Sequence, residues 1–226
     1  MRIALVTLAL GCSHAAPPPA KPAAQGFEFT VRKDYFDGLR GDTAALDRSI
    51  ATCEAALAKN ANDAEALVWH GAGLIGRSSF AFRKGDIQTG VPLYQQGLGE
   101  MDRAVELAPE NVGVRIPRGA VVLATAPFVP DAQKASLVQR GIADYEKTLA
   151  VQQPYFATLT LHSREQLLYG LLDGYAQLGD LAKAKTYFQR MQHDAAGSQL
   201  LARAEARANG DAVGGATPCE QCHAAR

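Results

Sequence analysis

The sequence predicts an all-helical fold, and two observations carry this prediction. Apolar and small residues recur every three or four positions over long stretches, which is the period of one helix face; Leu67, Gly71, Leu74 and Ser78 are one such series. Runs of β-branched residues are few, and only Val121-Val122 and residues 158–161 suggest strands. With 226 residues, the chain is long enough for one ordinary core or a short array of helical pairs.

Residues 1–12 have the pattern of an export signal. Arg2 provides the positive charge, residues 3–10 are apolar, and Gly11-Cys12 follows. The apolar run is too short to span a bilayer. The segment resembles a bacterial lipoprotein signal, which implies cleavage before Cys12 and a lipid on its thiol. An ordinary secretory signal cut near Ala15 or Ala16 is the alternative, and both readings predict export to the periplasm or outer membrane.

Residues 13–27 read as a spacer, since proline and alanine dominate them and give an extended segment without a core. The helical body is expected over residues 28–209. A short helix should end near Gly41, and a second should begin at Asp42 or Thr43 and continue to Ala58. Cys53 lies on its apolar stripe and is expected to be a core residue.

The central feature of this body is a helical hairpin over residues 64–111. Its first arm ends near Gly85, where a glycine supplies the backbone freedom of a helix end. Thr89 or Gly90 is expected to begin the second arm, with Pro92 in its first turn. Neither arm can bury its apolar stripe alone, so the two should pack together.

The remaining helices follow at shorter spacing. Pro117 should kink a helix begun at Val112 or delay its start. Asp131 is expected to cap the next helix, and Ser163 the first helix of a fourth pair. Residues 198–208 are expected to form a last helix covering the end of the array.

The hairpin resembles a tetratricopeptide repeat (TPR). The family's small and apolar positions correspond to Leu67, His70, Gly71 and Leu74 in the first arm and to Gly97, Met101, Ala104 and Pro109 in the second. Both arms are about two turns longer than in the standard unit of about 34 residues. A fourth unit fits without insertion, at Leu168, Tyr175, Gly179, Asp180, Ala184 and Phe188. The resemblance implies a TPR-like α-solenoid of about four hairpins with a C-terminal capping helix.

The resemblance also implies a protein or peptide partner in a concave groove lined by the first helices. The family's groove positions correspond to Glu65, Val68, Ala72 and Ile75, with Trp69 adjacent, and to Gln166, Tyr169, Asp173 and Ala176. The alternative is that these residues only pack neighbouring repeats together.

Charge and motifs narrow the function classes. Lys+Arg and Asp+Glu both number 23, so no basic excess favours nucleic acid, and a membrane is expected only through the lipid anchor. The sequence has no nucleophile elbow, phosphate loop or H-E-x-x-H motif, so no enzyme is predicted.

The tail, residues 210–226, carries the sharpest chemical motif. Cys219, Cys222 and His223 form C-x-x-C-H, the attachment sequence for c-type haem. The two thiols can reach the two vinyl groups, and His223 can ligate the iron. A disulfide, a redox dithiol and three zinc ligands remain the alternatives. Candidates for a distal haem ligand in the body are His70, Met101, His162, Met191 and His193.

Two functions therefore stay open. One is an exported scaffold that binds a partner in its groove, with an oxidised tail. The other is an electron-transfer or haem-sensing component in which the same scaffold carries one covalent haem.

Overall fold

The computed structural model describes residues 26–212, and this part of the chain is all-helical, as predicted. Its α-helices are α1 (Glu28–Leu39), α2 (Thr43–Leu57), α3 (Ala64–Arg83), α4 (Ile87–Leu107), α5 (Val112–Thr125), α6 (Asp131–Gln152), α7 (Leu161–Gln177), α8 (Leu181–Asp194) and α9 (Leu201–Ala208). Two short 3-10 helices, η1 (Ala126–Phe128) and η2 (Gln153–Thr158), flank α6.

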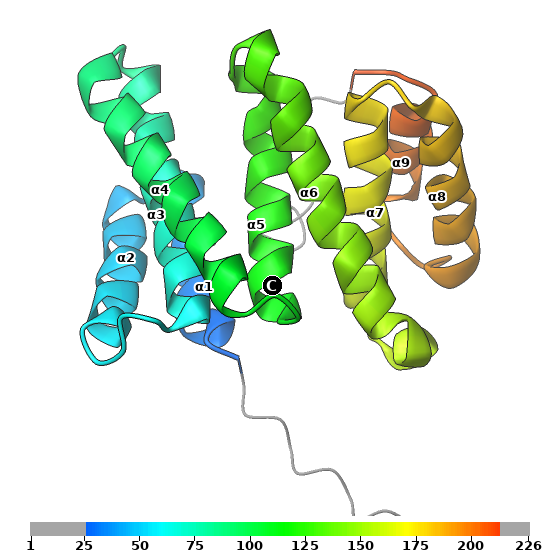
Figure 1. The fold of residues 1–226 in the computed structure, drawn as a ribbon. Helices are drawn as coiled ribbons and strands as arrows, with labels where there is room; N and C mark the ends of the chain where they lie inside the picture. The colour runs from blue at the N-terminus through cyan, green and yellow to red at the C-terminus, as the bar shows by residue number, and fades with distance from the viewer. Residues whose placement is uncertain (1–25, 213–226) are drawn as a thin grey trace, which may run out of the picture.

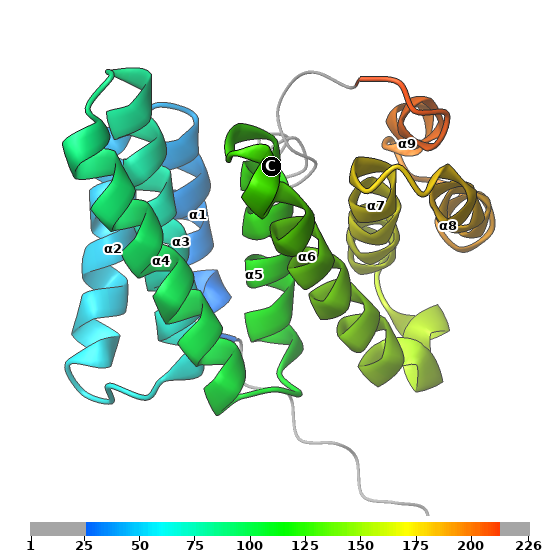
Figure 2. The same cartoon turned by 45° about the horizontal axis from the view of Figure 1, so that its top comes forward.

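The helices associate in consecutive pairs. α1 packs on α2, α3 on α4, α5 on α6 and α7 on α8, and α9 lies against α7 and α8. Figures 1 and 2 show the pairs side by side in chain order, with α9 at the C-terminal end. The first helices also contact one another, α1 with α3, α3 with α5 and α5 with α7. One side of the molecule is therefore built from the first helix of each pair.

Side-chain caps fix where most of the helices begin. Asp42, Asp63, Asp86 and Asp180 each accept a hydrogen bond from the backbone N–H three residues later, at 3.0 to 3.1 Å. An N-terminal N–H has no partner inside its own helix, so a short polar side chain before the helix satisfies it.

Several predicted helix ends were wrong. Asp86, and not Thr89 or Gly90, caps α4, because the left-handed turn at Gly85 (φ 76°) ends α3 immediately before it. Pro92 consequently lies inside α4 and not in its first turn. Asn111 caps α5 at Val112, so Pro117 neither delays the helix nor lies at its start.

The predicted starts of α6, α7 and α9 also differ from the structure. α6 already includes Asp131, with Pro130 before it. Thr160, not Ser163, caps α7, and its hydroxyl accepts from the N–H of Ser163 at 3.1 Å. The last helix begins at Leu201, three residues later than expected.

Two clusters of buried apolar residues form the core. One gathers side chains of α1 to α5, including Ile50, Val68 and Met101. The other gathers α5 to α9, including Leu123, Leu168 and Met191. Both include residues of α5, and Leu98 of α4 packs against each cluster. α5 therefore joins the two halves.

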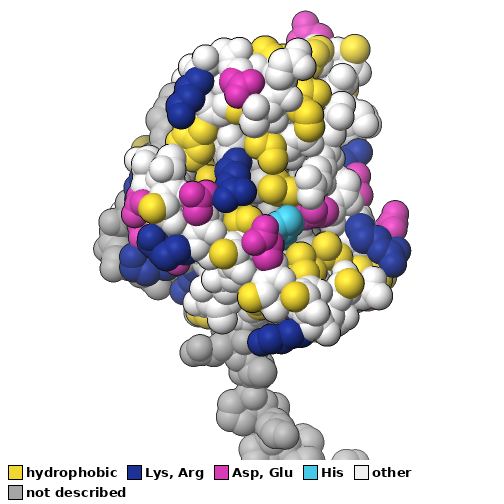
Figure 3. Space-filling model, turned by 90° about the vertical axis from the view of Figure 1, so that its left-hand side faces the viewer, with side chains coloured by type: hydrophobic (Ala, Val, Ile, Leu, Met, Phe, Trp, Pro, Cys, Tyr) yellow, Lys and Arg dark blue, Asp and Glu magenta, His cyan; other side chains and the backbone are white. Residues whose placement is uncertain are grey.

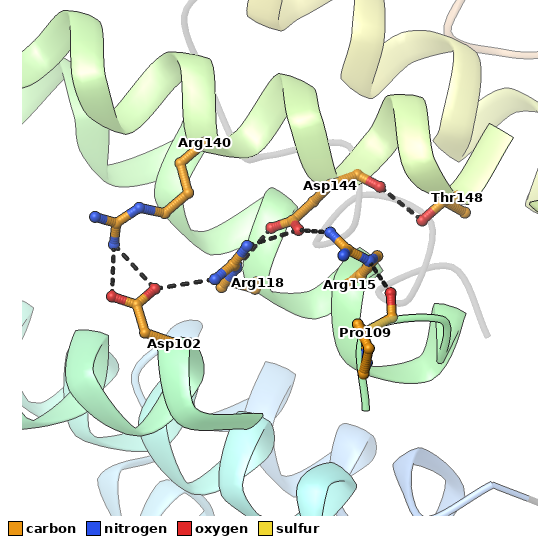
Figure 4. A network of polar contacts seen from close by, with 7 residues as sticks. All are labelled: Asp102, Pro109, Arg115, Arg118, Arg140, Asp144 and Thr148. Carbon is orange, nitrogen blue, oxygen red and sulfur yellow. Dashed lines mark hydrogen bonds and ion pairs between the residues drawn. The ribbon is translucent and has the colours of Figure 1, made fainter. Parts of the chain in front are cut away.

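An ion-pair network reinforces this junction (Figure 4). The fully buried carboxylate of Asp144 on α6 accepts hydrogen bonds from Arg115 and Arg118 of α5 at 2.7 to 2.8 Å. Arg118 also donates to Asp102 of α4 at 3.0 Å, and Arg140 of α6 binds the same carboxylate. We name these five residues the α4–α6 network. It ties the second helical pair to the third.

Candidate functional site

The first helices of the four pairs border an open hollow of about 930 Å³. Residues of α1, α3, α5 and α7 line it, with Tyr145 and Gln152 added from α6. Its volume is near the upper end of what small-molecule sites occupy, which is about 300 to 1,000 Å³.

Aromatic side chains form much of the hollow's wall. Tyr35 lies edge-on to Trp69, with ring centroids 5.4 Å apart, and Tyr145 and Tyr169 line the hollow from the C-terminal half. Phe128, also a lining residue, is 88% exposed. The indole N–H of Trp69 is buried and has no hydrogen-bond acceptor among the described residues. A buried donor without an acceptor costs about 1 to 3 kcal/mol.

Most of the predicted groove residues line this one hollow: Glu65, Trp69, Ala72, Ile75, Gln166, Tyr169 and Asp173. Two do not. Val68 is fully buried in the N-terminal core, because its side chain points into the α1–α5 cluster. Ala176 packs partly buried against the C-terminal core. Both side chains therefore pack at the cores and do not line the hollow.

The acidic groove residues are already engaged within the protein. Glu65 accepts from the backbone N–H of Phe27 at 2.8 Å and from the amide of Asn111 at 3.0 Å. Asp173 pairs with Arg207 of α9 at 2.6 Å. These carboxylates therefore hold the wall together, and Arg207 balances the charge of Asp173.

The N-terminal ends of α1, α3 and α7 meet at one end of the hollow. Burial raises the pKa of Glu28 and the charge of Glu65 adds to this, whereas Arg32 and His162 oppose the rise. Glu28, Arg32, Glu65 and His162 all line the hollow. His162, on the last pair, is thus close enough to Glu28 on the first for the two charges to interact.

The five side chains predicted as candidate distal haem ligands lie in different environments in the structure. Met101 and Met191 are completely buried in the two cores. His70 is buried against Glu100, with Nδ1 2.5 Å from a carboxylate oxygen. His193 has an 89% exposed side chain on α8. Within the described chain, His162 alone of the five lines the hollow.

The cysteines of the predicted sites, Cys12, Cys219 and Cys222, lie outside the described residues, as does His223. Cys53 is a free, fully buried thiol, as expected of a core residue, and burial raises its pKa to about 12.

Among residues 26–212, no group of three or more histidine, cysteine or carboxylate side chains lies close enough together to hold a metal ion. No helix in this range has the length and apolar character needed to cross a membrane.

The outer face shows no dominant charge where the two N-terminal pairs lie. In Figure 3, basic and acidic side chains alternate with apolar ones on this face.

The α4–α6 network could not be predicted from the sequence, because its partners are 16 to 38 positions apart and no motif marks them.

Comparison with known proteins found no match to the chain among family models, curated proteins or solved structures.

Proposed function

We propose that this protein is an exported scaffold of the TPR type, and that it binds an extended segment of a partner protein in the hollow. The observation that carries the proposal is the hollow itself, about 930 Å³ in volume and lined by the first helix of all four pairs. Two features of the sequence support the same proposal: its resemblance to TPR units and the export-signal pattern of residues 1–12.

The lining indicates what kind of segment would bind. Exposed aromatic rings such as Phe128 and Phe29 suit apolar or aromatic side chains. Arg32 and Arg83 line the hollow and lie over the rings of Phe29 and Phe80, at 4.3 Å from the centroids. These arginines favour a partner segment that carries a carboxylate.

Photo-crosslinking from the rim tests this proposal. A photoreactive amino acid at Phe128 should give a discrete adduct with an envelope protein. The same group at Ile87, an exposed apolar residue on α4 outside the hollow, should give none. With the partner identified, Phe128→Ala should weaken binding by about fivefold or more, as removal of an interface aromatic does. Equal adducts from both positions would contradict a specific site.

Export is tested separately. The chain should fractionate with the envelope, and Cys12→Ala should release it from the membrane fraction into the periplasm if the thiol carries lipid. Retention of the full-length chain in the cytoplasm would contradict export.

A second candidate function is haem carriage by the tail, and the position of His162 on the hollow favours it. In attachment, each thiol of Cys219 and Cys222 adds across one vinyl group, with the hydrogen passing to carbon and a thioether forming. The bound group would supply one-electron chemistry. In a host that matures c-type cytochromes, the chain should gain the mass of one haem, and Cys219→Ala with Cys222→Ala should abolish the gain. A colourless chain lighter by two hydrogen atoms indicates the disulfide instead.

A further inference from the structure

We infer that Arg83 selects the partner segment by binding an aspartate or glutamate side chain of that segment, next to an apolar or aromatic side chain that packs on Phe128. The inference rests on the proposed function, binding of an extended segment in the hollow, and deepens it by naming the chemistry of that segment. Three features of residues 26–212 support it.

The first feature is the charge of Arg83. Arg32, the other arginine on the wall of the hollow, pairs with Glu28 at 3.7 Å. Asp173 is balanced by Arg207, as described above. Arg83 lines the hollow as well, and no carboxylate of residues 26–212 lies within ion-pair distance of its guanidinium group. Arg83 is therefore the arginine of the wall whose charge a partner can neutralise.

The second feature is that this guanidinium group is held in place. It lies over the ring of Phe80, 4.3 Å from the centroid. The contact restrains a long side chain that would otherwise lose rotamer freedom on binding, and it leaves the N–H donors at the edge of the guanidinium plane for a ligand. A carboxylate can accept two parallel hydrogen bonds from this planar group.

The third feature is the difference between the two ends of the hollow. Glu28 and Glu65 line the end formed by helix N-termini, where burial and the charge of Glu65 raise the pKa of Glu28. Arg83 lies in the last turn of α3, and Phe128 lies in η1, directly after α5. Figure 1 shows the ends of α3 and α5 at the same edge of the molecule. An acidic side chain is therefore disfavoured at the first end and favoured at the second.

Arg83 is not among the groove positions that the resemblance to a repeat implies. It lies eight residues beyond Ile75, in the part of the first arm that exceeds the standard unit. A competing role is purely structural, because a cation in the last turn of a helix stabilises the helix dipole. That role affects stability, but it does not affect which segments bind.

Selection from a library of random peptides tests the inference without a known partner. The peptides are joined through their C-terminal ends to a phage coat protein, so no carboxylate comes from a free C-terminus. The full chain should select peptides in which an aspartate or glutamate lies within a few residues of an aromatic or large apolar residue. Arg83→Glu should instead select lysine or arginine at the acidic position.

Lys84→Glu is the matched control, because Lys84 is adjacent in sequence and exposed but does not line the hollow. This variant should keep the acidic preference of the wild-type chain. Circular dichroism establishes that both variants fold. If Lys84→Glu changed the preference as much as Arg83→Glu, the general charge of the surface would be responsible and the inference would be overturned.

Binding of one selected peptide in solution measures the size of the effect. Replacing its acidic residue by the corresponding amide should weaken binding to the wild-type chain by about fivefold, as loss of a partly exposed charge pair does. Arg83→Gln should weaken binding of the unaltered peptide by the same factor. The two changes together should cost no more than either alone, since both remove one interaction.

The outcomes separate the inference from the proposed function. Peptides that need Phe128 for binding but show no acidic preference, or keep that preference in Arg83→Glu, overturn the inference and leave the proposed function standing. Failure to select any peptide, or binding that is unchanged in Phe128→Ala, overturns the proposed function and the inference with it.

Discussion

Asp144 is a charged residue that lies entirely inside the protein. Its carboxylate is fully buried, and the guanidinium groups of Arg115 and Arg118 that bind it have side chains only 14% and 11% exposed. Burial alone would lower the pKa of Arg118, but hydrogen bonding and attraction from Asp144 and Asp102 outweigh it and raise the pKa. Charges buried in this way are tolerated only together.

Asp144→Ala should therefore lower the free energy of unfolding by about 3 to 5 kcal/mol, since it leaves two buried arginines without their shared carboxylate. Urea denaturation of the full chain measures the change. Asp47→Ala is the control, because Asp47 pairs with Arg77 on the surface, where both side chains are well exposed. That pair should contribute at most about 1 kcal/mol, and equal losses would contradict the role given to burial.

His70 should make stability depend on pH. Its hydrogen bond to Glu100 raises its pKa above the usual 6.5, burial opposes the rise, and the charges of Glu100 and Glu54 add to it. A histidine whose pKa is raised by folding stabilises the folded state fully below the unfolded pKa. This stabilisation is lost as the pH rises through the folded pKa.

Unfolding free energies measured between about pH 5 and 9 should consequently fall above about pH 6.5, the usual histidine pKa. Glu100→Gln keeps a hydrogen-bonding side chain but removes the charge. In this variant, the decrease in unfolding free energy above about pH 6.5 should be smaller. An unchanged profile in that variant would show that another group is responsible.

At the scale of the element, α3 and α4 owe their close packing to two glycines. A Cβ at Gly97 would lie 2.6 Å from the carbonyl oxygen of Gly71, and one at Gly71 would lie 2.5 Å from the carbonyl oxygen of Gly97. Backbone faces backbone at this crossing, so neither position has room for a side chain.

Gly97→Ala should lower stability by about 1 to 3 kcal/mol, because the two helices must separate. Gly99→Ala, on the same helix, should raise stability by about 0.5 to 1 kcal/mol, since a Cβ there meets open space and alanine favours the helix. Thermal unfolding of the two variants separates the effects. If Gly97→Ala were as harmless as Gly99→Ala, the close crossing would be disproved.

The helices themselves could be predicted from the sequence better than their ends could. Periodic stripes such as Leu67 to Ser78 locate a helix, because burial of one face requires that period. The ends depend on which of two nearby polar residues caps the helix. Asp86 competes with Thr89, and Thr160 with Ser163, and only the position of the preceding turn decides which one caps.

At the scale of the whole molecule, the two core clusters should unfold with some independence, because they meet mainly at α5 and at the α4–α6 network. Ile50→Ala, in the N-terminal core, should lower the hydrogen-exchange protection of α1 to α3 by about 2 to 5 kcal/mol. α7 and α8 should keep most of their protection. A uniform drop across residues 28–208 would instead show one cooperative unit.

The site was predicted in part, and the reason lies in the helix faces. Trp69, Tyr169 and Asp173 line one hollow, on the helix faces that the resemblance to a repeat predicts to point inward. Val68, the residue before Trp69, is instead fully buried in the N-terminal core. Glu28 of α1 and His162 of α7 line the same hollow, and no local sequence pattern indicates that residues so far apart in the chain lie on one surface.

The shielding of Cys53 has a consequence for maturation. A thiol with a pKa of about 12 and no exposed surface presents almost no thiolate at neutral pH, so it neither exchanges with disulfides nor attacks an electrophile. Once the body has folded, oxidants and electrophiles therefore do not reach the thiol of Cys53. Mispairing between Cys53 and any other cysteine of the chain is thereby prevented.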